Sequence, residues 1–237
     1  MKMKFINAVN KEEMGALAAD IFTEAINAKP DLVIGLATGS TPLPLYGELI
    51  KRCKDGKLDF SKVRSVNLDE YVGLPGTHDQ SYRYFMNENL FNHINIDPAN
   101  THLPNGMAED QGAECARYDA LIDDLGGIDL QLLGIGFNGH VGFNEPDDFF
   151  SNGTQVVKLT ESTVNANSRF FSDPSEVPKY AMTTDIRHIM LAKKIVLVAG
   201  AEKKEILEEA LNGKITPKVP ASVLQLHSDV TIILADE

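Results

Sequence analysis

A glycine-rich segment in the middle of the chain carries three side chains suited to acid–base chemistry. It reads Gly134-Ile-Gly-Phe-Asn-Gly-His-Val-Gly-Phe-Asn-Glu-Pro and contains Asn138, His140 and Glu145. Glycine lets a backbone turn tightly and approach a ligand closely. Histidine titrates near neutral pH, and a neighbouring carboxylate favours its protonated form. We therefore interpret His140 as a proton-transfer residue that Glu145 could orient and Asn138 could hold in place.

Two other interpretations of His140 are a surface histidine beside an ordinary turn and a zinc ligand. The density of glycines around it argues against the first. The second requires another His or Cys at ligand spacing, and His140 has none. Cys53 and Cys115 are far apart in the sequence and also lack such neighbours, so we interpret them as reduced thiols. The sequence predicts neither a metal nor an organic cofactor.

Two adjacent acids follow an apolar run earlier in the chain. Asp69 and Glu70 stand in the segment Asn67-Leu-Asp-Glu-Tyr-Val-Gly-Leu. Successive side chains of an extended chain point in opposite directions, so the two carboxylates are expected to have different tasks. A carboxylate at the end of a strand could abstract a proton, or it could cap the following turn. Taken without other information, the structural role is the simpler interpretation.

The formal net charge of −12 argues against a nucleic-acid partner, since phosphate backbones are bound by clustered Lys and Arg. A smaller anion could still bind where hydrogen-bond donors or positive charges are gathered at one site. Thr38, Gly39, Ser40 and Thr41, in a turn that leads into a helix near Pro42, could bind phosphate through backbone N–H groups and hydroxyls. The same residues could instead cap that helix, and the turn lacks the lysine of a P-loop.

Two cations elsewhere in the chain could complete an anion site. Arg169, in Asn167-Ser-Arg-Phe-Phe, offers a planar fork suited to phosphate. Lys203, in Gly200-Ala-Glu-Lys-Lys, offers a point charge at the start of a predicted helix. Each could also be an ordinary solvated surface charge, which is how we interpret Lys204.

The elements that must position these residues alternate along the chain. A first strand is predicted near 4–6. Five short apolar runs, typical of strands buried on both faces, come after it at 32–36, 63–68, 130–135, 195–198 and 230–234. A helix is predicted to begin after Asn10, with Glu13 completing a capping box. Further helices are predicted at about 42–55, 81–92, 109–125 and 201–212.

This alternation predicts one α/β domain over residues 1–237, with a mainly parallel central sheet and helices on both faces in three layers. Ligands of such sheets bind beyond the carboxyl ends of the strands. The segments with candidate site residues follow predicted strands, so we expect them to meet at one edge. No signal peptide or membrane-spanning run is found, which predicts a cytoplasmic protein without a membrane partner.

Five motifs together resemble the glucosamine-6-phosphate deaminase family. They are GLATGSTPLPLY, NLDEYVGL, GIGFNGHVGFNEP, NANSRFF and VLVAGAEKKEIL, and they occur in the family's order from about residue 30 to the end of the chain. The stretches DEYVGL and GHVGFNEP are the most diagnostic. The resemblance implies a Rossmann-like sheet and the conversion of glucosamine 6-phosphate and water to fructose 6-phosphate and ammonia.

The resemblance also implies residue roles. Asp69 matches the base that moves a proton between C2 and C1, and His140 matches the residue that catalyses ring opening. Glu145 and Asn138 stand at the positions that support it. Phosphate binding carries over to the turn at Thr38 to Thr41, to Arg169 and to Lys203.

Two departures from the family pattern are visible. Some members have Asp at the position of Asn138, so a fully charged group around His140 is not available here. Some members also continue past the last strand with an extension tied to hexamer assembly and to activation by the N-acetylated sugar phosphate, whereas this chain stops at Glu237. We expect a monomer or small homo-oligomer without that activation.

Two rival functions remain. A 6-phosphogluconolactonase shares the fold and a similar Gly-His loop, but DEYVGL and the acid in GHVGFNEP favour the deaminase. A non-catalytic sugar-phosphate sensor would normally add a DNA-binding domain, for which this acidic chain has no room.

The polar segment at about 155–184, which contains Arg169, is a candidate active-site lid.

Overall fold

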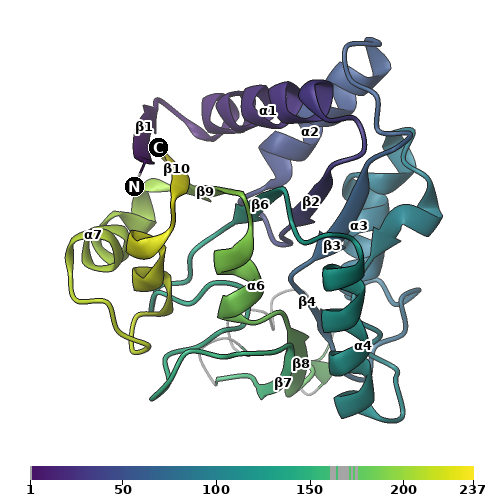
Figure 1. The fold of residues 1–237 in the computed structure, drawn as a ribbon, viewed down its shortest axis with the longest axis vertical. Helices are drawn as coiled ribbons and strands as arrows, with labels where there is room; N and C mark the ends of the chain where they lie inside the picture. The colour runs from purple at the N-terminus through teal and green to yellow at the C-terminus, as the bar shows by residue number, and fades with distance from the viewer. Residues whose placement is uncertain (1, 161–163, 165–170, 172, 174–175) are drawn as a thin grey trace.

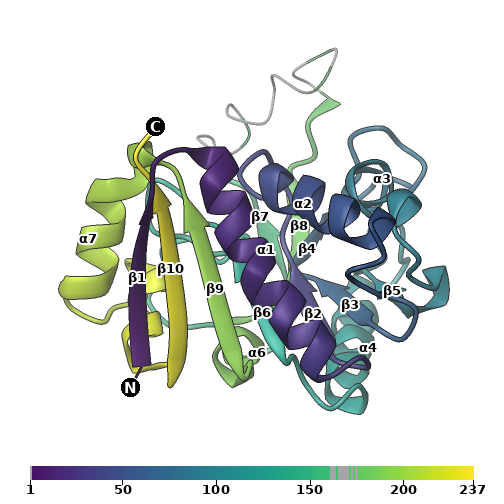
Figure 2. The same ribbon diagram turned by 90° about the horizontal axis from the view of Figure 1, so that it is seen from above.

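A seven-stranded sheet forms the centre of the computed structural model, which describes residues 2–160, 164, 171, 173 and 176–237. Its strand order is β1-β10-β9-β6-β2-β3-β5, and every neighbouring pair is parallel (Figure 2). The strands are β1 (Lys2–Ala8), β2 (Val33–Leu36), β3 (Arg64–Asn67), β5 (Thr101–His102), β6 (Leu130–Leu133), β9 (Lys194–Ala199) and β10 (Asp229–Ala235). The six predicted strands are confirmed, and β5 was missed because two residues carry no apolar pattern.

Helices cover both faces of this sheet, as the continuous apolar strands require. Figure 1 shows α1 (Lys11–Ala28) and α2 (Leu43–Lys54) over one face, with α4 (Gln111–Asp124), α6 (Ile186–Leu191) and α7 (Lys204–Asn212) on the opposite side. The central strands β2 and β6 are buried along their whole length, and they belong to one continuous hydrophobic core. The predicted three-layer α/β class is confirmed.

Helix α1 illustrates how local sequence sets these elements. The Asn10 side chain accepts a hydrogen bond from the Glu13 backbone N–H at 2.9 Å, and the Glu13 carboxylate accepts one from the Val9 N–H at 2.6 Å. This pair fixes the helix start, as the capping signal predicted. One face of the helix is buried against the sheet, through Met14, Ala18, Ala19, Phe22 and Ile26.

A second, smaller sheet was not predicted. It contains β4 (Asp69–Tyr71), β8 (Tyr180–Thr183) and β7 (Gln155–Lys158), in that order and antiparallel. These strands have three or four residues and mixed polarity, too little for a pattern of period two to be recognised. The sheet has its own apolar cluster around Tyr71 and Phe143.

The remaining elements of the described residues are short. Helix α3 (Tyr82–Asn89) follows β4, and 3₁₀ stretches connect other elements: η1 (Phe91–His93), η2 (Pro98–Asn100), η4 (Ala201–Lys203) and η5 (Pro220–Leu226). The predicted lid begins in β7 and ends just beyond β8, and much of the chain between these strands lies outside the described residues. Among the helices that the structure describes, none has the length and apolarity to cross a membrane.

Candidate functional site

The order of the strands brings four of the predicted site segments to one edge of the sheet. The segments that carry Lys203, His140, Thr38 and Asp69 follow β9, β6, β2 and β3 respectively. These four strands are consecutive neighbours in the sheet and run in the same direction. From β2 the chain adds β3 and then β5 toward one edge of the sheet, whereas β6, β9 and β10 are added on the other side of β2. Ligands of such sheets bind where the strand order reverses, which here is between β2 and β6. We therefore place the candidate site at the carboxyl ends of these strands.

Asp69 is a buried carboxyl group on β4, the strand that follows β3. Its residue is 7% exposed, and among the described residues its Oδ1 atom has no hydrogen-bond partner. Burial, with a smaller contribution from the charge of Glu70, raises the pKa of Asp69 to about 8. A Cβ atom at Gly142 would lie 3.7 Å from Asp69 Oδ2, so the glycine-rich loop passes directly beside this carboxyl group. An unpaired buried acid in such a place can accept a proton from a ligand.

Glu70 has a different task from its neighbour. Its carboxylate accepts hydrogen bonds from the backbone N–H groups of Tyr71, Tyr82 and Arg83 at 2.8–2.9 Å, two of which lie in the first turn of α3. Burial raises the pKa of Glu70, although these three hydrogen bonds oppose that shift. The alternation expected of adjacent residues on a strand is therefore seen: Glu70 supports α3, and Asp69 does not.

Replacing Glu70 with Ala is expected to destabilise the fold. Three N–H groups, buried or partly buried, would lose their acceptor, and each unsatisfied donor costs about 1–3 kcal/mol. We expect the free energy of unfolding, measured by urea denaturation, to fall by roughly 3 kcal/mol or more. Glu208→Ala, at an exposed position of α7, is the matched control. Equal losses for the two variants would contradict the structural role of Glu70.

The three polar side chains of the glycine-rich loop are in mutual contact. The Asn138 amide donates to Glu145 Oε2 at 2.6 Å, and its Oδ1 accepts from the His140 backbone N–H at 3.2 Å. The same Glu145 oxygen lies 3.4 Å from His140 Nδ1. A Cβ atom at Gly136 would lie 2.2 Å from the imidazole ring, so this position must lack a side chain for His140 to keep its place. The imidazole is partly exposed and can reach a ligand.

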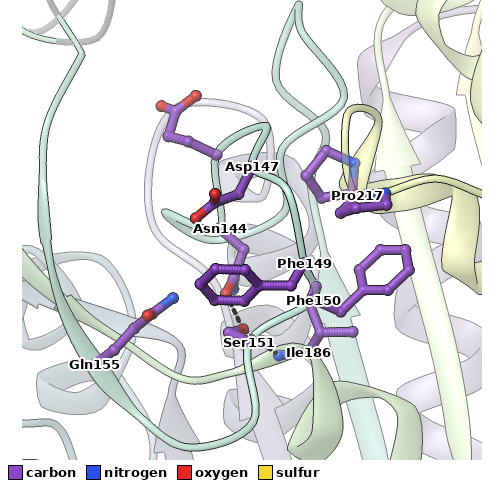
Figure 3. A pocket seen from close by; sticks show the side chains of 10 residues that line it. Asn144, Asp147, Phe149, Phe150, Ser151, Gln155, Ile186 and Pro217 are labelled. Carbon is purple, nitrogen blue, oxygen red and sulfur yellow. Dashed lines mark hydrogen bonds between the residues drawn. The ribbon is translucent and has the colours of Figure 1, made fainter.

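Residues that sequence reasoning missed hold this loop against the small sheet. Thr183 Oγ1 accepts the Phe143 N–H at 3.1 Å, and the Asn144 amide donates to the Thr184 carbonyl at 2.8 Å. Ser151 then donates to Asn144 Oδ1 at 2.7 Å, within a small pocket beside Glu145 that Figure 3 shows. The contacts join residues up to forty positions apart. No local pattern could have revealed them.

The turn at Thr38 to Thr41 follows β2 directly. Gly39 has φ of 93°, a conformation that glycine adopts without strain. Pro42 occupies the N-cap of α2, and no side chain caps this helix. Among the described residues, the hydroxyls of Ser40 and Thr41 have no hydrogen-bond partner. The capping alternative is therefore not seen, and these hydroxyls are available to a ligand.

Tyrosine side chains packed behind this turn connect it to the rest of the site. The Tyr82 hydroxyl contacts the Thr38 side chain, and the Tyr46 hydroxyl donates to the Ala37 carbonyl. Burial raises the pKa of both phenols above their ordinary value. Both tyrosines therefore remain neutral hydrogen-bonding groups that fix the turn. Neither contact could be recognised from a sequence pattern.

The two predicted cations differ in what the structure describes. Lys203 lies at the end of η4, half-buried, and its Nζ is 2.9 Å from the centroid of the Phe137 ring in the glycine-rich loop. Burial lowers its pKa. Lys204 is exposed. Arg169 lies outside the described residues, so its predicted place in the site stays a prediction.

Within the described residues, one group of His and Asp side chains is close enough to hold a metal ion. It consists of Asp119, Asp185 and His188, and none of them is a predicted site residue. His188 Nδ1 already lies 2.6 Å from Asp185 Oδ1, and Asp185 also caps α6 through the His188 N–H. Burial alone would lower the pKa of His188, yet the two carboxylates outweigh it and raise that pKa. We interpret the cluster as a structural link between α4 and α6.

Two curated proteins are similar to this chain over nearly its whole length. A glucosamine-6-phosphate deaminase of Lachnoclostridium phytofermentans is 58% identical, with 99% of this chain and 100% of the relative covered. One of Clostridium perfringens is 55% identical, with 99% and 98% covered.

Solved structures show the same fold. A monomeric glucosamine-6-phosphate deaminase superposes with a TM-score of 0.96 at 45% identity, covering 99% of this chain and 98% of the other. A 6-phosphogluconolactonase from Thermotoga maritima shares the fold, with a TM-score of 0.79 at 19% identity and complete coverage of both chains. Residues 8–233 also match the family described as glucosamine-6-phosphate isomerases/6-phosphogluconolactonase. This chain belongs to that family.

Proposed function

We propose that this protein is an enzyme that converts glucosamine 6-phosphate and water to fructose 6-phosphate and ammonia. The observation that carries the proposal is the buried carboxyl group of Asp69, which has a pKa of about 8 and lies beside the loop that presents His140. An isomerising deamination requires such a base, because a proton must leave one carbon and reach the next. The names of relatives that are more than half identical over the whole chain support the same activity.

The first chemical step is opening of the sugar ring. We assign His140 to this step, since it can deliver a proton to the ring oxygen while the C1 hydroxyl loses one, which leaves the open-chain aldehyde. Glu145, with Oε2 3.4 Å from Nδ1, can orient the imidazole, and Asn138 is hydrogen-bonded to Glu145 and to the His140 backbone. The neutral amide of Asn138 orients the carboxylate without adding a second negative charge.

Proton transfer between carbons follows. Asp69 takes the proton from C2 of the open-chain aldehyde, and the carbonyl oxygen at C1 gains a proton from solvent to give an enolamine. Asp69 then returns a proton to C1, which leaves a protonated imine at C2. Water adds to that imine and ammonia departs, so that C2 becomes the ketone of fructose 6-phosphate. Burial makes the Asp69 carboxylate a stronger base, because it raises the pKa to about 8, well above that of an ordinary aspartate.

Phosphate binding is assigned to the turn at Thr38 to Thr41, to Lys203 and to Arg169. The backbone of the turn precedes α2, and the hydroxyls of Ser40 and Thr41 are available. Lys203 supplies a positive charge at the same edge of the sheet. Arg169 enters the proposal on its sequence motif alone. Together these groups offset the unfavourable net charge of −12 for an anionic substrate.

Replacing Lys203 with Met is expected to raise KM about 10-fold and to change kcat little. A charged hydrogen bond contributes about 1.5–3 kcal/mol, and the phosphate carries the same charge in the ground and transition states. Steady-state kinetics with glucosamine 6-phosphate checks this, with exposed Lys204→Met as the matched control. A KM equal to that of the control would remove Lys203 from the phosphate site.

The rival function is hydrolysis of 6-phosphogluconolactone, because the lactonases share the fold. Hydrolysis of an ester needs no base between two adjacent carbons, so it leaves the buried carboxyl of Asp69 without a task. The experiment is to measure turnover of both substrates by the purified protein in parallel. Consumption of the amino sugar phosphate with no enzyme-dependent lactone hydrolysis supports the deaminase, and the reverse result would overturn it.

We propose further that the protein acts as a monomer or small homo-oligomer in the cytoplasm, without activation by N-acetylglucosamine 6-phosphate. The structural likeness to a monomeric deaminase supports this proposal. Light scattering of the purified protein is expected to give the mass of one chain or of a small multiple of it, and kinetics to give a Hill coefficient near one. A hexamer, or a Hill coefficient that N-acetylglucosamine 6-phosphate shifts, would contradict it.

A further inference from the structure

The exposed aromatic ring of Phe137 contacts Lys203, the lysine assigned to phosphate binding, and belongs to the loop that carries the acid–base residues. Phe137 lies in the glycine-rich loop next to Asn138, and it is 72% exposed. The Lys203 ammonium sits over its face, with Nζ 2.9 Å from the ring centroid. The loop follows β6 and Lys203 follows β9, which are adjacent strands. Both groups therefore lie at the edge where the substrate is proposed to bind.

We propose that Phe137 is a positioning residue that holds Lys203 ready to bind the phosphate group of the substrate. This inference rests on the proposed function, since it assigns a task only if Lys203 binds phosphate. A lysine side chain has four rotatable bonds, and fixing them costs conformational entropy when a ligand binds. A ring that already attracts the ammonium through its π face reduces that cost.

The chemical nature of the group that contacts the Lys203 ammonium matters as much as the contact itself. Lys29, Lys193 and Lys218 each form an ion pair with an aspartate at 2.6–2.7 Å. Among the described residues, Lys203 forms no such pair. A carboxylate at ion-pair distance would neutralise the ammonium and compete with the phosphate, whereas an aromatic face attracts the cation without adding a negative charge.

The ring also links the phosphate site to the acid–base site. Its neighbour Asn138 is hydrogen-bonded to Glu145 and to the His140 backbone. The position of Lys203 is thus set relative to the loop that carries His140. The phosphate and the ring oxygen belong to one substrate molecule, so a fixed spacing between these two parts of the site helps bind it in the reactive orientation.

A double-mutant cycle tests the inference: KM and kcat are measured for wild type, F137L, K203M and the double variant. We expect F137L to raise KM roughly 3- to 10-fold, as a partly desolvated cation–π contact predicts, with kcat changed less than about 2-fold. In the K203M background, F137L is expected to change KM by less than about 2-fold. The ring-preserving F137Y should keep KM near the wild-type value, and F5L, at an exposed phenylalanine of β1, is the matched control.

Each outcome of the cycle has a definite meaning. An equal rise in KM from F137L in both backgrounds would overturn the inference, because Phe137 would then act on the substrate directly. An unchanged KM in F137L, with a raised KM in K203M, would overturn it while leaving the phosphate role of Lys203 intact. An unchanged KM in K203M would overturn both assignments, whereas ammonia release by the wild type would still support the proposed reaction. Thermal unfolding of each variant shows that the fold is retained.

Discussion

Asp69→Asn is expected to lower kcat by about 10²- to 10⁴-fold, the usual contribution of a positioned proton-transfer group. Asparagine has nearly the same shape as aspartate but cannot accept the C2 proton. The phosphate contacts are unaffected, so KM should change little. In wild type, kcat/KM should rise with pH up to about 8, where the Asp69 carboxyl group becomes ionised. Steady-state ammonia release across a range of pH measures both effects.

The same substitution is expected to stabilise the fold at alkaline pH. The pKa of Asp69 is about 8 in the folded protein, against about 3.9 for an aspartate in an unfolded chain. The folded state therefore retains a proton that the unfolded state releases, and the free energy of unfolding falls as the pH rises from about 4 to about 8. The amide of the variant does not titrate, so the melting temperature of Asp69→Asn should exceed that of wild type by more at pH ~9 than at pH ~5.

Together these results would show a buried acid kept for chemistry at a cost in stability. Glu70→Gln is the control at the neighbouring position, where the side chain supports α3 and is not assigned to the reaction. Near wild-type turnover in Asp69→Asn would refute the assignment of the base. An equal loss of kcat in Glu70→Gln without loss of stability would show that the two adjacent acids have been assigned the wrong way round.

His140→Asn is expected to lower kcat by a similar factor, about 10²- to 10⁴-fold, through loss of the proton transfer that opens the ring. The variant should still bind the open-chain alditol 2-amino-2-deoxyglucitol 6-phosphate with an unchanged inhibition constant, because that compound has no ring to open. Inhibition constants and kcat are measured in the same assay. His93→Asn, at an exposed position after α3, is the matched control.

Two results would count against this role of His140. Retention of wild-type turnover would remove the residue from the chemistry. A large rise in the inhibition constant of the alditol, at unchanged kcat, would show that His140 binds the open chain and does not open the ring.

The main sheet could be predicted from the sequence because each central strand is a continuous apolar run. Once the strands are parallel neighbours, the segments that follow them must share an edge, so the sequence alone was enough to place Thr38, His140 and Lys203 together. The division between Asp69 and Glu70 also followed from the backbone geometry of a strand. These features depend on local periodicity, which a single sequence contains.

The parts that could not be predicted depend on contacts between distant segments. Strands β4 and β8 are too short to show a pattern, yet β8 supplies Thr183, which anchors the glycine-rich loop at Phe143. The pairing of Lys203 with Phe137 joins residues that are far apart in the chain. The glycine at position 136 could be seen in the sequence, but its close approach to His140 is visible only in three dimensions.

The most direct test of the proposed reaction is the product balance of the wild-type protein with glucosamine 6-phosphate in the presence of a chelator. We predict ammonia and fructose 6-phosphate in a one-to-one ratio, formed at a rate that the chelator does not change. Fructose 6-phosphate cannot form from this substrate unless its nitrogen is released. Two results would therefore contradict the predicted product balance. Ammonia without the ketose phosphate would rule out isomerisation through Asp69, and absence of both products would rule out the deaminase.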